Sequence, residues 1–107
     1  MFIVIVPPGP PRVTTSNPVA KEGEMFHLTC ASEGGSPDPV IQWYRDGVLL
    51  QGKVTPGKSR DTPTTNVLSV KPTINDDRAL YTCTAWNRAI REENKMSASY
   101  AMTVHCK

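Results

Sequence analysis

Apolar and polar residues alternate along several short segments of this chain. In "MFHLTCAS", Phe26, Leu28 and Cys30 fall on one side of an extended strand, and His27 and Thr29 fall on the other. A period of two is typical of a strand that buries one face and exposes the other. We therefore expect a half-buried strand here, with its polar residues in solvent.

The segment "VIQWYRDGVLL" continues the alternation and adds a turn signal. Ile41 and Trp43 share the apolar side, and the pair Asp46-Gly47 follows shortly after them. An Asp-Gly pair tolerates positive φ and is typical of two-residue hairpin turns. The pattern predicts that the chain folds back at this pair into a second strand over residues 48–50.

The rest of the chain contains further short apolar segments separated by breakers. Between Gln51 and Thr65 the chain is polar and contains Pro56, Gly57 and Pro63, which predicts a loop with at most one short edge strand. The inward positions beyond this loop are expected to be Leu68, Val70, Ala98, Tyr100, Met102 and Val104. About seven short strands with turns between them favour an all-β fold, an antiparallel β-sandwich.

Length and charge narrow the possible functions. A chain of 107 residues is long enough for one ordinary domain and too short for two cores. It has 12 Lys and Arg residues and 10 Asp and Glu residues, and these charges are scattered along the sequence. We therefore expect no nucleic-acid partner and no direct membrane contact. The longest apolar run, Phe2 to Val6, is too short to span a membrane.

The first residues are expected to lie outside the domain. The run "FIVIV" lacks the basic flank and the small-residue cleavage site of a signal peptide. The segment "PPGPPR" follows it at once and favours a stiff polyproline-like linker. We interpret residues 1–9 as the tail of a preceding domain plus a linker, and residues 10–107 as the domain itself.

Sequence motifs for catalysis and metal binding are absent. No Gly-x-Ser-x-Gly, His-Glu-x-x-His or glycine-rich phosphate loop occurs in the chain. His27 and His105 are far apart in sequence, and no paired spacing such as Cys-x-x-Cys accompanies them. We expect no enzyme activity, no cofactor and no metal ion.

Four residues fall in an order that is typical of one domain family. Cys30 is followed thirteen residues later by Trp43, and the run "DRALYTC" ends at Cys83 with Tyr81 two residues before it. Together with "WYRDG", this arrangement resembles the immunoglobulin superfamily over nearly the whole chain, from residue 10 to about residue 105.

The resemblance implies an immunoglobulin-like sandwich with Greek-key connections and a Cys30–Cys83 disulfide between its two sheets. Trp43 would pack against the bridge, Leu68 would lie in the core, and the hydroxyl of Tyr81 would bind backbone a few residues upstream. The span between the cysteines is too short for the extra strands of a variable domain, so the C2 or I type is implied.

Some roles stay open at this point. The two core cysteines are also compatible with buried free thiols, as in intracellular muscle immunoglobulin domains. We favour the disulfide because small secreted domains depend on such bonds. Cys106 is expected to be an unpaired terminal thiol, or a partner for a cysteine outside this sequence. Asp77 is expected to cap its own turn, or else to pair with Lys58 or Arg60.

One sheet face is the candidate binding surface. Exposed aromatic residues are frequent anchors of protein interfaces, and the alternation points Tyr44 and Trp86 outward. Their expected neighbours on that face are Gln42, Thr82, Thr84, Ser97 and Ser99. A lone exposed aromatic ring is also common on monomers. The end loops Glu33–Pro39 and Asn87–Lys95 are compatible with recognition or with plain solvated turns.

The resemblance implies an extracellular module of a multi-domain, single-pass cell-surface adhesion or recognition receptor, acting by protein–protein binding or as a rigid spacer. The segments "PPGPP" and "DDRALYTCTAWN" are similar to receptors of the nephrin and irregular-chiasm group, in which the terminal domain often makes the contact. The expected partners are homophilic or heterophilic cell-surface receptors and neighbouring domains of the same chain. The alternatives are a structural module of an intracellular filament-associated protein, and a segment of a secreted matrix protein or growth-factor receptor ectodomain.

Overall fold

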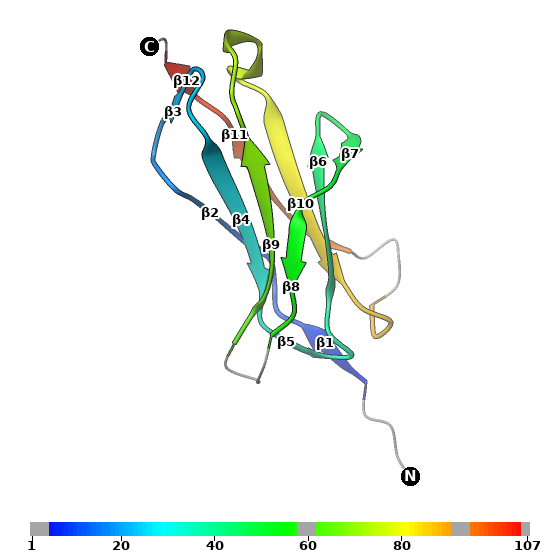
Figure 1. Ribbon diagram of the computed structural model, residues 1–107. Helices are drawn as coiled ribbons and strands as arrows, with labels where there is room; N and C mark the ends of the chain where they lie inside the picture. Colours follow the sequence, from blue (N-terminus) through cyan, green and yellow to red (C-terminus); the bar gives the residue numbers. More distant parts are fainter. Residues whose placement is uncertain (1–4, 58–61, 91–94, 106–107) are drawn as a thin grey trace.

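In the computed structural model, which describes residues 5–57, 62–90 and 95–105, two antiparallel sheets pack face to face (Figure 1). The first sheet has the strand order β11 (Met96–Ala101), β10 (Leu80–Trp86), β6 (Val40–Arg45) and β7 (Val48–Leu50). The second sheet has the order β2 (Arg12–Thr15), β4 (Phe26–Ser32), β9 (Thr64–Val70) and β8 (Lys53–Thr55). The predicted all-β sandwich is therefore confirmed.

Two short ladders lie at opposite ends of the sandwich (Figure 1). At one end β1 (Val6–Pro8) pairs antiparallel with β5 (Gly34–Ser36). At the other end β12 (Val104–His105) pairs parallel with β3 (Ala20–Lys21). A short 3-10 helix, η1 (Ile74–Asp76), precedes β10.

One of the two segments predicted to be loops contains a strand that the sequence did not predict. The segment 33–39, expected to be a loop, contains β5, because Gly35 has a φ of 89° and lets the chain approach Pro8 closely. A Cβ atom added at Gly35 would lie only 3.1 Å from the Cβ of Pro8. In the segment 51–65, by contrast, β8 is the short edge strand that the sequence predicts.

The predicted hairpin joins β6 to β7. Arg45 lies opposite Val48 in register, and Asp46 and Gly47 between them have φ values of 48° and 88°. Both angles lie in the left-handed region that an Asp-Gly pair tolerates. The turn therefore fixes the register of the edge strand β7.

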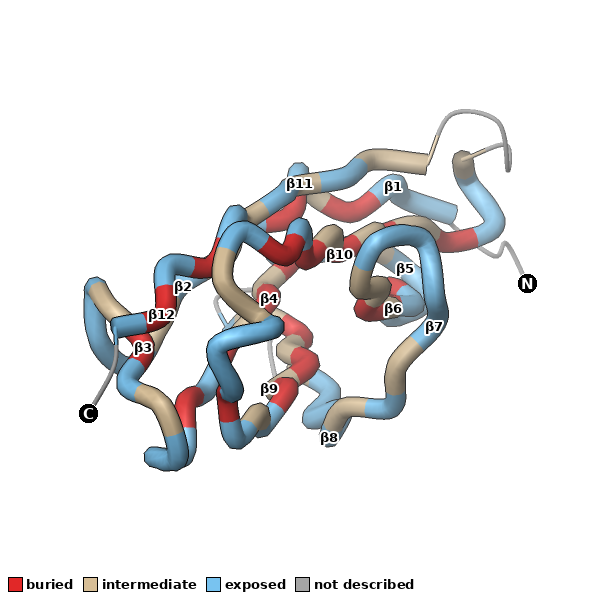
Figure 2. The backbone as a smooth tube through the Cα atoms, turned by 90° about the horizontal axis from the view of Figure 1, so that it is seen from above, coloured by how far each residue is buried: buried red, intermediate tan, exposed pale blue. Residues whose placement is uncertain are grey.

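The core is centred on a disulfide that joins the two sheets. Cys30 of β4 and Cys83 of β10 are bonded, with their Cα atoms 6.4 Å apart, and both side chains are fully buried. Trp43 is also fully buried and lies directly opposite Cys83 in the register of β6 and β10. Leu68 and Tyr81 belong to the same buried cluster. Figure 2 shows buried positions recurring along the central strands, between the two layers.

A polar contact crosses between the sheets beside the disulfide. Asn66 is only 3% exposed, and its Nδ2 donates to the carbonyl oxygen of Ile41 at 2.8 Å. In the opposite direction, Trp43 Nε1 donates to the backbone oxygen of Asn66 at 2.8 Å. These bonds connect β9 with β6 and give the buried indole nitrogen the partner that it needs. Gly52 makes room for the amide, because a Cβ atom at that position would collide with Asn66 Oδ1.

Two neighbouring aspartates make different contacts from the one expected. Asp77 Oδ1 accepts a hydrogen bond from the backbone N–H of Val104 at 2.9 Å. The local cap predicted for Asp77 is made by Asp76, whose Oδ2 accepts from the Thr73 N–H at 2.8 Å. The capping prediction is therefore wrong by one residue, because the carboxylate of Asp77 binds another strand.

Some predictions are not tested by the described residues. Lys58, Arg60 and Cys106 lie outside the described ranges. The domain boundary placed between residues 9 and 10 stays a prediction. Residues 1–9, which the sequence assigns to the lead-in before the domain, include the strand Val6–Pro8, and this strand pairs with β5 of the domain.

Removal of the disulfide is predicted to destabilise the fold. The bridge closes a loop across a sequence separation of 53 residues. Replacing both Cys30 and Cys83 by Ala should therefore lower the free energy of unfolding by about 4 kcal/mol in the chain-entropy model. Urea unfolding followed by tryptophan fluorescence measures the loss. A decrease smaller than about 1 kcal/mol would show that the bridge is not the main constraint on the unfolded chain.

The side-chain amide of Asn66 is predicted to stabilise the fold independently of the Cys30–Cys83 disulfide. Asn66→Ala leaves the buried Ile41 carbonyl without this donor and should cost about 1–3 kcal/mol in the free energy of unfolding. Asn75→Ala is the matched control, because Asn75 is exposed and accepts from Arg45 through its backbone oxygen. Equal stabilities for the two variants in urea would contradict a structural role for the Asn66 side chain.

Candidate protein-binding face

The outward residues of the first sheet form one continuous surface. We call it the outer face and define it as Val40, Gln42, Tyr44, Leu49, Leu80, Thr82, Thr84, Trp86, Ser97 and Ser99. All of these residues are at least partly exposed. The outward positions predicted from the alternation all belong to it. Whether they bind a partner stays a prediction.

Two cross-strand rows bring the predicted residues together. One row runs through Tyr44, Thr82 and Ser99, and the next through Gln42, Thr84 and Ser97. Within the first row, the hydroxyls of Thr82 and Ser99 are 3.1 Å apart. Between the rows, the hydroxyl of Tyr44 donates to Gln42 Oε1 at 3.2 Å. These side chains are therefore held by one another on a rigid sheet.

Trp86 ends β10 at one side of the outer face. The Nζ atom of Lys95 lies over its ring, 4.4 Å from the centroid, as in a cation–π contact. The indole Nε1 of Trp86 and the Oγ1 of Thr84 are buried and have no hydrogen-bond partner within the described part of the chain. Unpaired buried groups are costly.

Three apolar residues of the outer face are absent from the sequence-based set. Val40, Leu49 and Leu80 are 42%, 50% and 45% exposed. Val40 could have been found by extending the period of two from Gln42, and the hairpin register places Leu49 opposite Tyr44. The contact of Lys95 with Trp86 could not have been found, because it depends on the register of β11 against β10.

The outer face is nearly uncharged. No residue of the set carries a formal charge, and the cationic Lys95 lies over the ring of Trp86 at one side of it. The face thus combines aromatic rings, exposed aliphatic side chains and small hydroxyl groups. Its aromatic rings and its lack of charge are features of the centre of protein interfaces, where aromatic residues are enriched and charges are depleted.

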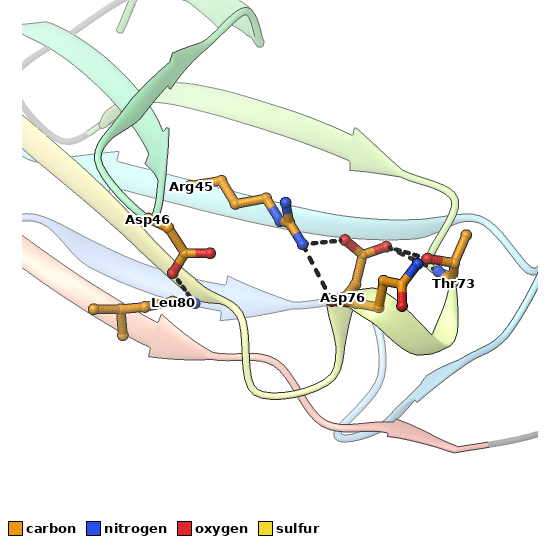
Figure 3. A network of polar contacts seen from close by, with 6 residues as sticks. Arg45, Asp46, Thr73, Asp76 and Leu80 are labelled. Carbon is orange, nitrogen blue, oxygen red and sulfur yellow. Dashed lines mark hydrogen bonds and ion pairs between the residues drawn. The ribbon is translucent and has the colours of Figure 1, made fainter.

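A polar network holds the β6–β7 hairpin against the start of β10 (Figure 3). The backbone N–H of Asp46 donates to the Leu80 carbonyl at 2.9 Å, and Asp46 Oδ1 accepts from the Leu80 N–H at 3.1 Å. Beside this pair, Arg45 Nη2 lies 2.9 Å from Asp76 Oδ1 and 3.3 Å from the backbone oxygen of Asn75. Because Leu80 belongs to the outer face, the network fixes that end of the surface.

Tyr81 lies next to this network. Its ring is buried, and the charged side chains of Arg45, Asp76 and Asp46 influence its hydroxyl. The hydrogen bond to upstream backbone that the resemblance implies stays a prediction. Burial raises the pKa of Tyr81 above its ordinary value of 10.0, and the negative charge of Asp76 raises it further, while Arg45 acts in the opposite direction. Burial also raises the pKa of Tyr100. Neither residue lies on the outer face.

Other kinds of site find little support in the part of the chain that is described. Residues 5–57, 62–90 and 95–105 contain no cluster of side chains that could hold a metal ion, and no helix long and apolar enough to cross a membrane. His27 and His105 are both exposed, as the alternation predicts. Two surface hollows of about 360 and 300 Å³ lie near Phe26 and near Arg12, and neither is lined by the outer face.

A family model decides the assignment of this fold. The model of the immunoglobulin domain matches residues 10–87, which include both bonded cysteines, Trp43 and Tyr81. This chain belongs to the immunoglobulin domain family.

Curated relatives of this immunoglobulin domain are much longer than the domain itself. It is 36% identical over 98 residues to human Kin of IRRE-like protein 2, a match that covers 81% of the domain and 13% of the relative. It is 34% identical over 92 residues to human Junctional adhesion molecule A, with 80% of the domain and 30% of the relative covered. The domain thus spans only a small part of each relative.

Solved structures share the same sandwich. The full ectodomain of mouse nectin-like molecule 4, Ig1–Ig3, matches with a TM-score of 0.84 and 25% identity, covering 95% of this immunoglobulin domain and 35% of that chain. The structure of Rst D1-D2 matches with a TM-score of 0.76 and 28% identity, covering 94% of the domain and 51% of that chain.

Ionisation of Tyr81 is predicted to destabilise the domain at alkaline pH. Because its pKa is raised in the folded state, its contribution to stability is complete below the unfolded pKa of about 10 and is lost as the pH rises through the folded pKa. The free energy of unfolding should therefore begin to fall as the pH reaches about 10 and should continue to fall until the pH has passed the folded-state pKa. Tyr81→Phe should make this fall smaller. An identical fall in the wild-type and variant domains would show that Tyr81 is not the group responsible.

Proposed function

We propose that this immunoglobulin domain is an extracellular module of a multi-domain cell-surface adhesion or recognition receptor, and that its outer face binds a protein partner. Tyr44 and Trp86 are the proposed anchors of the contact. Gln42 and Thr84 are the proposed contact residues between them. The observation that carries this proposal is the nearly uncharged outer face with its exposed aliphatic and half-buried aromatic side chains.

The disulfide and the relatives support the extracellular part of the proposal. Disulfides persist in oxidising compartments and are rare in the cytosol, so the Cys30–Cys83 bond favours a secreted or cell-surface location. Two relatives carry adhesion in their names, Junctional adhesion molecule A and Neural cell adhesion molecule 1 from chicken, which is 36% identical over 75 residues. Attachment through a single membrane span is part of the proposal.

The position of the candidate residues supports the binding part. Binding surfaces on a sandwich need side chains fixed on a rigid frame, either on a sheet face or in the end loops. At one end of this sandwich, the segment 34–36 is already paired with the chain's own strand β1. The outer face is partly exposed along its whole length, so it is the surface we assign to a partner. The partner is a cell-surface receptor, either another copy of the same receptor or a different one.

A charge placed at the centre of the outer face tests this assignment. Thr84→Arg puts a guanidinium where a partner would exclude water, so it should weaken partner binding by roughly tenfold or more. Thr29→Arg is the matched control, because Thr29 is a similarly half-buried threonine in β4 of the opposite sheet. Both variants are compared with the wild type in bead aggregation, for self-binding, and in a screen against cell-surface ectodomains.

Comparison of the two variants with the wild type distinguishes partner binding from a spacer role. The proposal expects binding that Thr84→Arg weakens and Thr29→Arg leaves unchanged. Equal binding by both variants would place the contact elsewhere. Absence of any clustering or captured receptor for the wild type would favour the rigid-spacer role and overturn the binding assignment.

A further inference from the structure

The lead-in strand β1 is tied to the domain by polar contacts at both of its ends. Beyond Pro8, the N–H of Gly9 donates to the Glu33 carbonyl at 2.7 Å, and the hydroxyl of Ser32 donates to the Gly9 carbonyl at 2.7 Å. Ser32 is fully buried at the end of β4. At the other end of the strand, the carbonyl of Val6 accepts a bond from Asn87.

Asn87 contacts three segments with one side chain. Its Nδ2 donates to the Val6 carbonyl at 2.7 Å and to the Pro37 carbonyl at 3.0 Å, and its Oδ1 accepts from the Ala89 N–H at 3.0 Å. The residue is 2% exposed, so water is a poor substitute for these partners. We call Asn87 with these three partners the Asn87 bridge.

The partners of the bridge are far apart in the sequence. Val6 lies 81 residues from Asn87, and Pro37 lies 50 residues from it. Val6, Pro37 and Ala89 are exposed residues, so the buried group in these contacts is the Asn87 side chain. Opening a contact leaves part of this buried amide unpaired, and an unpaired buried group costs more than the hydrogen bond itself contributes. Displacement of β1 therefore also weakens the positions of the loops at residues 34–37 and 88–90.

We infer that Asn87 couples the lead-in strand to both end loops, so that β1 and these loops open and close as one unit while the core stays folded. The bound state of β1 fixes the direction in which the chain reaches the sandwich. It also fixes the loop conformations. Release of β1 then frees both loops to rearrange.

Hydrogen exchange of single backbone amides tests this coupling, because it reports local opening. Ser32→Ala removes one bond to Gly9 and does not touch the loop after Asn87. If the unit is coupled, exchange at Ala89 should accelerate on the order of tenfold together with exchange at Gly9, while Tyr81 in the core keeps its rate. Acceleration at Gly9 alone would overturn the inference. Acceleration of Tyr81 by the same factor would also overturn it, because the opening would then be global.

The reverse experiment starts at the other end of the unit. Asn87→Ala leaves the Gly9 N–H and its acceptor unchanged, yet exchange at Gly9 should accelerate on the order of tenfold, with Tyr81 unaffected. Asn75→Ala, which removes the side chain of an exposed asparagine, should change neither rate. A wild-type exchange rate at Gly9 in Asn87→Ala would show that the bridge does not link the lead-in to the loops.

Discussion

The covalent bond between Cys30 and Cys83 is the constraint on which the rest of this sandwich depends. It fixes the separation of the two sheets at one point, and Trp43 fills the space beside it because it lies directly opposite Cys83. The indole then donates to Asn66 of the other sheet, so the same point is held by a covalent bond, an aromatic ring and a polar pair. A bridge alone would restrict the unfolded chain. Together with the indole, it also selects one register.

That register produces the outer face. Because side chains alternate along a strand, turning Cys83 inward turns Thr82, Thr84 and Trp86 outward, and a shift of one residue would exchange the two sets. The neighbouring strand β6 obeys the same alternation: because Trp43 points inward, Gln42 and Tyr44 point outward. The surface that we assign to a partner is thus the face of the first sheet that points away from the bridge. The alternation that buries the bridge therefore also fixes the side chains of the outer face on a rigid sheet.

Features that follow from local patterns could be predicted from the sequence. The alternation identified the inward residues and the outer rows, and Asp46-Gly47 identified the hairpin. The contacts that could not be predicted are polar and long-range: Asn66 with Ile41, Arg45 with Asp76, and Asn87 with Val6. An isolated Asn or Arg in a strand pattern does not indicate its partner, because the partner is set by how the sheets pack. The misassigned cap at Asp77 has the same origin, since two adjacent aspartates offer the same local chemistry and only the position of β12 separates them.

The most direct test of this account is a count of thiols. The chain has three cysteines, and the structure bonds Cys30 to Cys83. A sample made in an oxidising compartment and never exposed to reductant is treated with a thiol reagent in native buffer and again in denaturant. The account predicts one reactive thiol per chain in denaturant, from Cys106. Three reactive thiols in denaturant would contradict it, because the sheets would then be held without the bond and an intracellular structural module would become the better reading.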